Sequence, residues 1–313
     1  MTSTHIDILL ATHNGAQFVE TQIESILAQS HRDWKLLVAD DGSTDGTVAV
    51  IRHFERNDKR IKLVSTARRG GPAASFLYLL THSDAEYSFL CDQDDYWAEN
   101  KLQRLLDAFA EHPPETPTLI ASDAHVVDGG MRITADSFLD QAKIPPGETA
   151  FNTVLVQNPV LGCTSAVNRP LREIVARAGV DPSQVIMHDW WLALAASSMG
   201  ILHIIPDKLV RYRQHGENRV GAFRYSTRSL LASSRRGRAK TAAIVGQARH
   251  FRACHYVALC PSSQRVLDRF LSSFDSPAVT RPFRLARGGN LKSGLLRRVG
   301  QLAFAMDYRE GRR

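Results

Sequence analysis

Near its start the chain reads Ile6-Asp7-Ile8-Leu9-Leu10-Ala11-Thr12, a short apolar run that ends in polar residues. This run is typical of a buried strand, and residues 18–29 are typical of a helix, because their apolar side chains recur on one face. Strands are predicted again at 36–39, 61–64 and 87–91, each followed by a helical pattern. The alternation predicts an α/β fold with a mostly parallel sheet flanked by helices.

Polar clusters stand where three of these predicted strands end. They are Thr12-His13-Asn14-Gly15, the run Asp40-Asp41-Gly42-Ser43, and Asp92-Gln93-Asp94-Asp95. In open α/β sheets the carboxyl ends of the strands line the ligand crevice. The sequence therefore predicts that the three clusters converge on one site.

Two of the clusters are rich in carboxylates. Three of them within residues 92–95 repel one another, so this cluster needs either a bound hard cation or full solvation at a turn. Its place directly after a strand favours the cation. Residues 40–47 are typical of a turn with a helix cap, and a carboxylate there could also accept the ring N–H of a pyrimidine base.

Two later motifs also carry polar groups. The run His188-Asp189-Trp190-Trp191 stands at a predicted helix start, where Asp189 alone could be an N-cap with tryptophans packed beside it. The run Arg211-Tyr212-Arg213-Gln214-His215 could be a surface loop, although arginine also offers a bidentate fork to phosphate. Taken alone, neither motif separates the two interpretations.

Together the strand-end motifs resemble those of the family 2 glycosyltransferases, which have the GT-A fold, and the resemblance covers residues 5–222. It implies transfer of a sugar from a nucleotide diphosphate donor onto an acceptor hydroxyl. It assigns nucleotide binding to Thr12, Asn14, Asp40, Asp41 and Asp92.

The same resemblance assigns the chemistry. Asp94 and Asp92, with His215, would hold a divalent cation, Mg²⁺ or Mn²⁺, and Arg213 with His215 would contact the donor diphosphate. Asp189 would be the general base of an inverting transfer. The tryptophan pair would form a platform for the acceptor, through Trp190 and Trp191.

The wording of these motifs is most similar to that of bacterial rhamnosyltransferase-type members. This implies a dTDP-linked deoxysugar, a glycan or lipid-linked glycan acceptor, and synthesis of a surface polysaccharide such as an O-antigen. UDP-hexose donors stay open, because a few pocket side chains set sugar preference.

Three rival functions have weaker support. A nucleotidyltransferase would want a Gly-rich, Lys-containing phosphate loop, which residues 11–17 lack. A nucleic-acid-binding protein would interleave aromatic residues with an extensive basic face, so no nucleic-acid partner is expected. A non-catalytic carbohydrate-binding relative would not need both the acidic cluster and Asp189.

Charge divides the chain of 313 residues. Residues 281–313 hold nine Lys or Arg and two Asp or Glu, so they account for the whole net charge of +7. We expect a catalytic domain over 1–222, with loops or a flap between about residues 123 and 160, and a basic helical extension over 223–313. Apolar and basic residues interleave from 282 to 306, so the extension could lie on an anionic membrane surface or pack on the catalytic domain.

Four cysteines, Cys91, Cys163, Cys254 and Cys260, lack the spacing of a zinc site and are interpreted as free thiols. No cationic stretch followed by an apolar run opens the chain, so no secretory signal is expected. The resulting expectation is a cytoplasmic protein, peripheral at the inner face of the cell membrane if the extension binds lipid.

Overall fold

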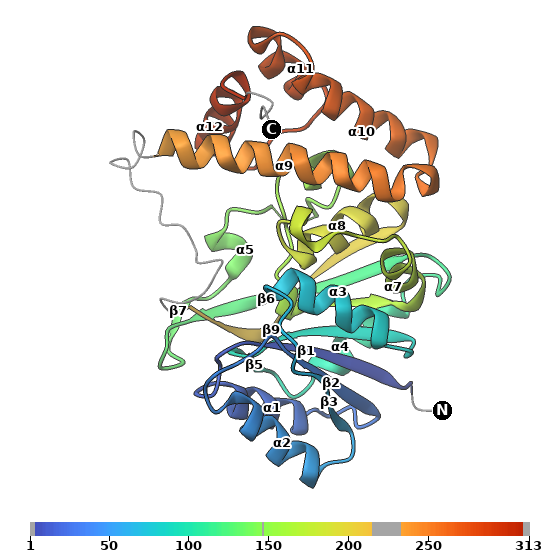
Figure 1. Ribbon diagram of the computed structural model, residues 1–313. Helices are drawn as coiled ribbons and strands as arrows, with labels where there is room; N and C mark the ends of the chain where they lie inside the picture. Colours follow the sequence, from blue (N-terminus) through green and yellow to red (C-terminus); the bar gives the residue numbers. More distant parts are fainter. Residues whose placement is uncertain (1–3, 146, 215–232, 309–313) are drawn as a thin grey trace.

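The computed structural model describes residues 4–145, 147–214 and 233–308. Within them, nine strands form one mixed sheet in the order β3-β2-β1-β4-β8-β6-β9-β5, with β7 paired to β6 (Figure 1). The strands are β1 (Ile6–Thr12), β2 (Trp34–Asp40), β3 (Ile61–Ser65), β4 (Tyr87–Asp92), β5 (Tyr96–Trp97), β6 (Thr118–Val127), β7 (Ile133–Ala135), β8 (Ser165–Asn168) and β9 (Ile201–Arg213).

Helices cover both faces of the sheet, and the last four stack at one end of the molecule (Figure 1). Those of the sheet region are α1 (Val19–Leu27), α2 (Thr47–Asn57), α3 (Pro72–His82), α4 (Lys101–Phe109), α5 (Phe138–Gln141), α6 (Phe151–Val154), α7 (Arg169–Ala176) and α8 (His188–Met199). The C-terminal helices are α9 (Ser233–His255), α10 (Pro261–Phe274), α11 (Arg281–Arg287) and α12 (Leu295–Met306). Short 3₁₀ turns include η1 (Gly162–Thr164) and η2 (Pro182–Gln184).

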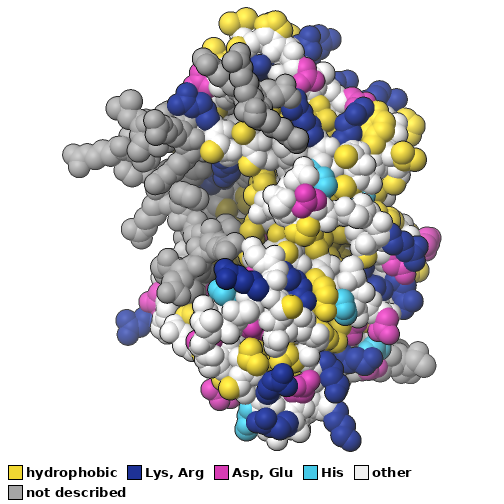
Figure 2. Space-filling view, in the orientation of Figure 1, with side chains coloured by type: hydrophobic (Ala, Val, Ile, Leu, Met, Phe, Trp, Pro, Cys, Tyr) yellow, Lys and Arg dark blue, Asp and Glu magenta, His cyan; other side chains and the backbone are white. Residues whose placement is uncertain are grey.

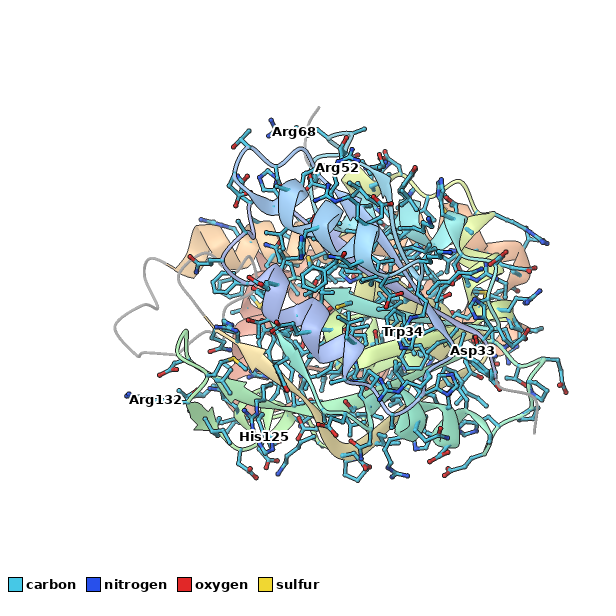
Figure 3. The ribbon with its side chains drawn as sticks, turned by 90° about the horizontal axis from the view of Figure 1, so that it is seen from below. Asp33, Trp34, Arg52, Arg68, His125 and Arg132 are labelled. Carbon is cyan, nitrogen blue, oxygen red and sulfur yellow. The ribbon has the colours of Figure 1, made fainter. Side chains whose placement is uncertain are left out.

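The sheet brings strand ends together at one edge. Strands β1 to β4 run parallel to one another. Strand β8 is antiparallel to both β4 and β6, so β6 and its parallel neighbour β9 run in the same direction as β1 to β4. Asp33, just before β2, and Arg132, just after β6, accordingly lie on opposite sides in Figure 3. In this register Thr12 pairs with Asp40, and Ala11 pairs with Asp92. The predicted convergence of the three clusters is thus confirmed.

The apolar core has two parts, one on each face of the sheet. One joins the sheet to α1, α2 and α4, and the other joins it to α3, α7 and α8. The second part continues into α9 and α10 through Val245, Phe251, Leu267 and Phe270, all of them buried. The C-terminal helices therefore share their core with the sheet.

The predicted elements of the first 110 residues match the observed ones to within a few residues. The expectation of loops over 123–160 was partly wrong, since β6 runs through the middle of the sheet to Val127. Strand β9 extends to Arg213 because it pairs along the whole of β6. In the extension, Gly289 and Gly294 adopt positive φ between α11 and α12, so the amphipathic stretch is divided between two helices.

The predicted domain boundary near residue 222 falls outside the described residues, and the division stays a prediction. Among the helices that are described, none is both long and apolar enough to cross a membrane.

Candidate active site

The ends of β1, β2 and β4, which we call the carboxyl edge, comprise residues 12–15, 40–47 and 92–95. At its centre Asp40 is fully buried. Its carboxylate accepts the Thr12 hydroxyl at 2.9 Å and the Ser43 N–H at 2.8 Å. Both oxygens of Asp40 are therefore engaged within the protein, so Asp40 and Thr12 hold the loop in shape.

Asp41 fixes a second loop to this edge. One of its oxygens, Oδ1, accepts the backbone N–H groups of Arg69 and Gly70, the latter at 2.9 Å. Its own N–H donates to the Thr12 carbonyl at 2.8 Å. Both loop contacts fall on a single carboxylate oxygen, Oδ1.

A side-chain clip joins the loop after β1 to the loop after β4. The Gln93 amide accepts the His13 N–H at 2.9 Å and donates to the His13 carbonyl at 3.0 Å. Asn14, in the left-handed region with φ 46°, receives the Thr44 N–H on its amide oxygen at 2.9 Å. The three predicted clusters are thus hydrogen-bonded to one another, with Asn14 bonded to protein groups.

The acidic cluster gathers Asp92, Asp95 and the thiol of Cys163, whose ligand atoms all lie within 4.8 Å of one another. Burial, and then the charges of Asp95 and Asp94, raises the pKa of Asp92 well above its usual range. Burial and the Asp94 carboxylate raise the pKa of Asp95 to about 7. A divalent cation would relieve this repulsion.

The residues present fit a hard cation. Asp95 Oδ2 is buried without a hydrogen-bond partner among the described residues, and carboxylate oxygens suit Mg²⁺ or Mn²⁺. Burial raises the pKa of Cys163 well above its usual range, which keeps that soft ligand protonated. The sequence prediction named Asp94 and Asp92 as ligands, and the structure groups Asp92 with Asp95 as well.

Arg213 lies at the end of β9 and is nearly buried, with 7% of its surface exposed. Its N–H donates to Asp95 Oδ1 at 2.9 Å, and its guanidinium donates to the carbonyls of Asp94 and Gly129 at 2.7 and 2.8 Å. Arg213 therefore holds the Asp94 backbone and the Asp95 carboxylate in position through these hydrogen bonds. His215, predicted as a metal and diphosphate ligand, lies outside the described residues.

Lys101 is the cation that sequence reasoning missed. It is fully buried, its ammonium donates to the Cys163 carbonyl at 2.6 Å, and it sits 3.1 Å from the centre of the Trp97 ring. Burial lowers the pKa of Lys101 to about 7, while the nearby carboxylates of Asp95 and Asp92 favour its charge. One signal was available, since Lys101 occupies an apolar position of its helix.

Asp189 lies in the first turn of α8 with 6% of its surface exposed. Its carboxylate accepts the Gly162 N–H at 3.1 Å and the Trp190 N–H at 2.6 Å, which orients both oxygens. Burial raises the pKa of Asp189 to about 6 in spite of these bonds. A carboxylate with this pKa can accept a proton near neutral pH.

Gly162, whose N–H donates to Asp189, lies against the His188 ring. A Cβ at Gly162 would lie 2.6 Å from His188 Nε2, so no larger residue fits there without displacing the ring. His188 is buried and stacked on Phe76, with ring centroids 3.8 Å apart, and neither ring nitrogen has a hydrogen-bond partner in the described part of the chain. Burial lowers the pKa of His188 to about 3, so the ring is neutral.

The tryptophan pair does not form the predicted platform. Trp190 is 5% exposed and donates its indole N–H to the Val154 carbonyl at 2.7 Å. Trp191 is fully buried against Phe251 of α9. Both rings belong to the core around α8, a helix whose residues are buried on almost every side.

Comparison with known proteins identifies the family. Residues 7–169 match the model for glycosyl transferase family 2. The chain is 30% identical over 163 residues to the putative teichuronic acid biosynthesis glycosyltransferase TuaG of Bacillus subtilis, covering 52% of this chain and 61% of TuaG. It is 26% identical to the dTDP-rhamnosyl transferase RfbG of Shigella flexneri, over 68% of this chain and 74% of RfbG.

Solved structures agree on the fold. The mannosyltransferase PcManGT from Pyrobaculum calidifontis, in complex with GDP-Man and Mn²⁺, superimposes with a TM-score of 0.56. The match covers 91% of this chain and 73% of PcManGT at 17% identity. The α/β architecture of the chain is that of the GT-A glycosyltransferases. The family model spans more than half of the sequence, and the chain belongs to glycosyl transferase family 2.

Proposed function

We propose that this glycosyltransferase performs an inverting, metal-dependent transfer of a sugar from a nucleotide diphosphate onto a glycan hydroxyl. One juxtaposition carries the proposal. Two adjacent residues of η1 contact the proposed base and the proposed metal site. The Gly162 N–H donates to Asp189, and the Cys163 thiol lies beside Asp92 and Asp95. A buried base thus stands next to a site for the donor diphosphate.

The acidic cluster would hold a divalent cation through Asp92 and Asp94, with Asp95 alongside. When bound, the cation would supply positive charge to the departing nucleoside diphosphate, which is where negative charge develops in the transition state. PcManGT binds Mn²⁺ together with its donor, which supports the same need here. Arg213 and the clip through Gln93 would keep the cluster in position.

Asp189 would remove the proton from the acceptor hydroxyl. The freed oxygen attacks the anomeric carbon as the bond to the diphosphate oxygen breaks on the opposite face, so the anomeric configuration inverts. The two backbone N–H groups that donate to the Asp189 carboxylate fix its orientation. No covalent enzyme intermediate is required.

For the donor we propose a dTDP-linked rhamnose or another deoxysugar. The motif wording and the similarity to RfbG support it. Asp41 would accept the ring N–H of a pyrimidine base, and Thr12, Asn14 and Asp40 would shape the loop beneath it. A UDP-hexose presents the same N–H to Asp41, so it remains the second candidate.

The acceptor belongs to the same proposal. The similarity to TuaG and RfbG supports synthesis of a bacterial surface polysaccharide, on a glycan or lipid-linked glycan. Such an acceptor places the enzyme in the cytoplasm, peripheral at the inner face of the cell membrane. No part of this function calls for a nucleic acid.

The test is a transfer assay on the purified protein with Mn²⁺, a polyprenyl diphosphate-linked sugar, and either dTDP-rhamnose or UDP-glucose. Mass spectrometry identifies the product, and NMR gives the configuration of the new bond. We expect product only when metal and acceptor are both present, with an inverted anomer. A retained anomer, or equal turnover after removal of metal by chelation, would contradict the mechanism.

A further inference from the structure

Helix α12 leaves a row of large apolar side chains in water. Their exposed fractions are 77% for Leu295, 79% for Leu296, 58% for Val299 and 44% for Met306. At 3.6 residues per turn these positions fall within an arc of about 100° on one side of the helix. We call them the α12 apolar face.

The other side of α12 accounts for its packing. The Phe304 ring lies directly against Gly237 of α9, and Ala305 is fully buried. The helix is therefore held on the protein by one side while the apolar face points away. Isolated exposed apolar residues are normal on proteins, but a contiguous row on one helix marks an interaction surface.

Positive charges gather near the start of this helix. Burial, together with the charges of Lys240 and Arg297, lowers the pKa of Lys292 to about 8, so these three cations lie close enough to repel one another. Arg298, in the first turn of α12, is exposed. Figure 2 shows hydrophobic and basic side chains side by side at the surface over the C-terminal helices. An anionic partner that covers the apolar row would also meet Arg298, in a region that is already positively charged.

We propose that the α12 apolar face and the exposed Arg298 beside it bind an anionic lipid membrane surface. Apolar side chains would enter the boundary of the acyl chains, and the Arg298 guanidinium would meet lipid phosphates. The inference deepens the proposed function, because a lipid-linked acceptor offers its hydroxyl at such a surface. A second copy fits less well, since a two-fold contact would bring the two sets of cations together.

The test is co-sedimentation with vesicles of phosphatidylglycerol, compared with neutral phosphatidylcholine vesicles. The wild-type chain should bind the anionic vesicles. Leu296→Glu should weaken that binding at least about tenfold, since it places a charge in the apolar row. The matched control Val257→Glu, at a residue 97% exposed in the turn after α9, should bind as the wild type does.

A second pair of variants tests the charges. Arg298→Glu should weaken binding to phosphatidylglycerol about fivefold or more, whereas Arg56→Glu on α2 should have no effect. The proposal is overturned if the wild type stays in the supernatant, or if Leu296→Glu sediments as well as the wild type. It is also overturned if sedimentation velocity finds a dimer that Leu296→Glu dissociates.

Nucleotide binding measured on the same preparations separates this inference from the proposed function. We expect Leu296→Glu and Arg298→Glu to bind the nucleoside diphosphate as the wild type does. Loss of vesicle binding with intact nucleotide binding would locate the defect on the membrane surface. Loss of nucleotide binding in the wild type would instead count against the donor site.

Discussion

The carboxyl edge and the start of α8 hold several of their polar side chains by different kinds of contact. At the carboxyl edge, side chains such as Gln93 and Asn14 bond one loop to another and stay partly exposed. At α8, Asp189 is buried and held by the N–H groups of Gly162 and Trp190. The first arrangement suits binding of a large polar ligand, and the second suits a single proton transfer. Substitutions in the two regions should therefore change different kinetic constants.

The largest effect is expected at the base. Asp189→Asn keeps the shape of the side chain and one of its two bonds to backbone N–H groups but cannot take a proton, so kcat should fall about 10²- to 10⁴-fold. Affinity for the nucleoside diphosphate should not change. Asp181→Asn, at an exposed aspartate of the turn before α8, is the control and should keep full activity. Activity of Asp189→Asn close to that of the wild type would remove the base from the proposal.

The pH dependence sharpens the same assignment. The base must be deprotonated, and its pKa is raised to about 6, so log kcat/KM should fall with unit slope below about pH 6 and level off above it. An unshifted carboxyl would keep the rate flat down to about pH 4. Measuring kcat/KM against pH, at saturating metal, distinguishes the two profiles. A flat profile between about pH 4.5 and pH 8 would contradict the buried-base assignment.

The next effect is expected at Lys101, which links the two regions. Lys101→Met removes the bond to the Cys163 carbonyl and leaves Asp92 and Asp95 without their buried cation, which should lower the free energy of unfolding by about 2–3 kcal/mol. Urea unfolding measures this change. Lys62→Met, at an exposed position of β3, should unfold as the wild type does. Equal stability of the two variants would show that Lys101 has no bracing role.

At the carboxyl edge, Asp41→Asn should act on donor affinity. An amide oxygen can still accept the N–H groups of Arg69 and Gly70, but its NH₂ group cannot accept the N–H of a base. We expect about tenfold weaker nucleotide binding with little change in kcat. Asp33→Asn is the control, because Asp33 precedes the first residue of β2 whereas Asp41 follows its last (Figure 3). A fall in kcat without a change in affinity would place Asp41 in the chemistry instead.

The smallest effect is expected at the clip. Gln93→Ala removes two hydrogen bonds between partly exposed groups, which should weaken nucleotide binding only a few-fold. Gln93→Glu can still accept the His13 N–H, so it should fall between Gln93→Ala and the wild type. Gln103→Ala on the surface of α4 should be neutral in the same titration. No difference among these variants would show that the two loops hold their positions independently.

The sequence predicted the carboxyl edge better than the surroundings of α8. Strand ends follow from local apolar patterns, and the parallel register then places Thr12 beside Asp40 and Ala11 beside Asp92. The burial of Trp191 depends on α9, more than forty residues further along the chain, and that of Trp190 involves Val154, so no local pattern shows either. Gly162 was missed for the same reason, since its partner Asp189 is distant in sequence. The apolar helix position of Lys101 indicates burial, but it does not show the distant partner Cys163.

We propose above all that the carboxyl edge binds a nucleotide donor through a metal ion. Calorimetric titration of dTDP and of UDP, with and without Mn²⁺, tests it on the wild type, on Asp94→Ala and on Asp92→Asn. We expect binding that needs the metal and is lost in both variants, and the nucleoside diphosphate that binds more tightly indicates whether the donor is a dTDP-sugar or a UDP-sugar. Absence of binding by the folded wild type, or binding that neither the metal nor the variants affect, would contradict it.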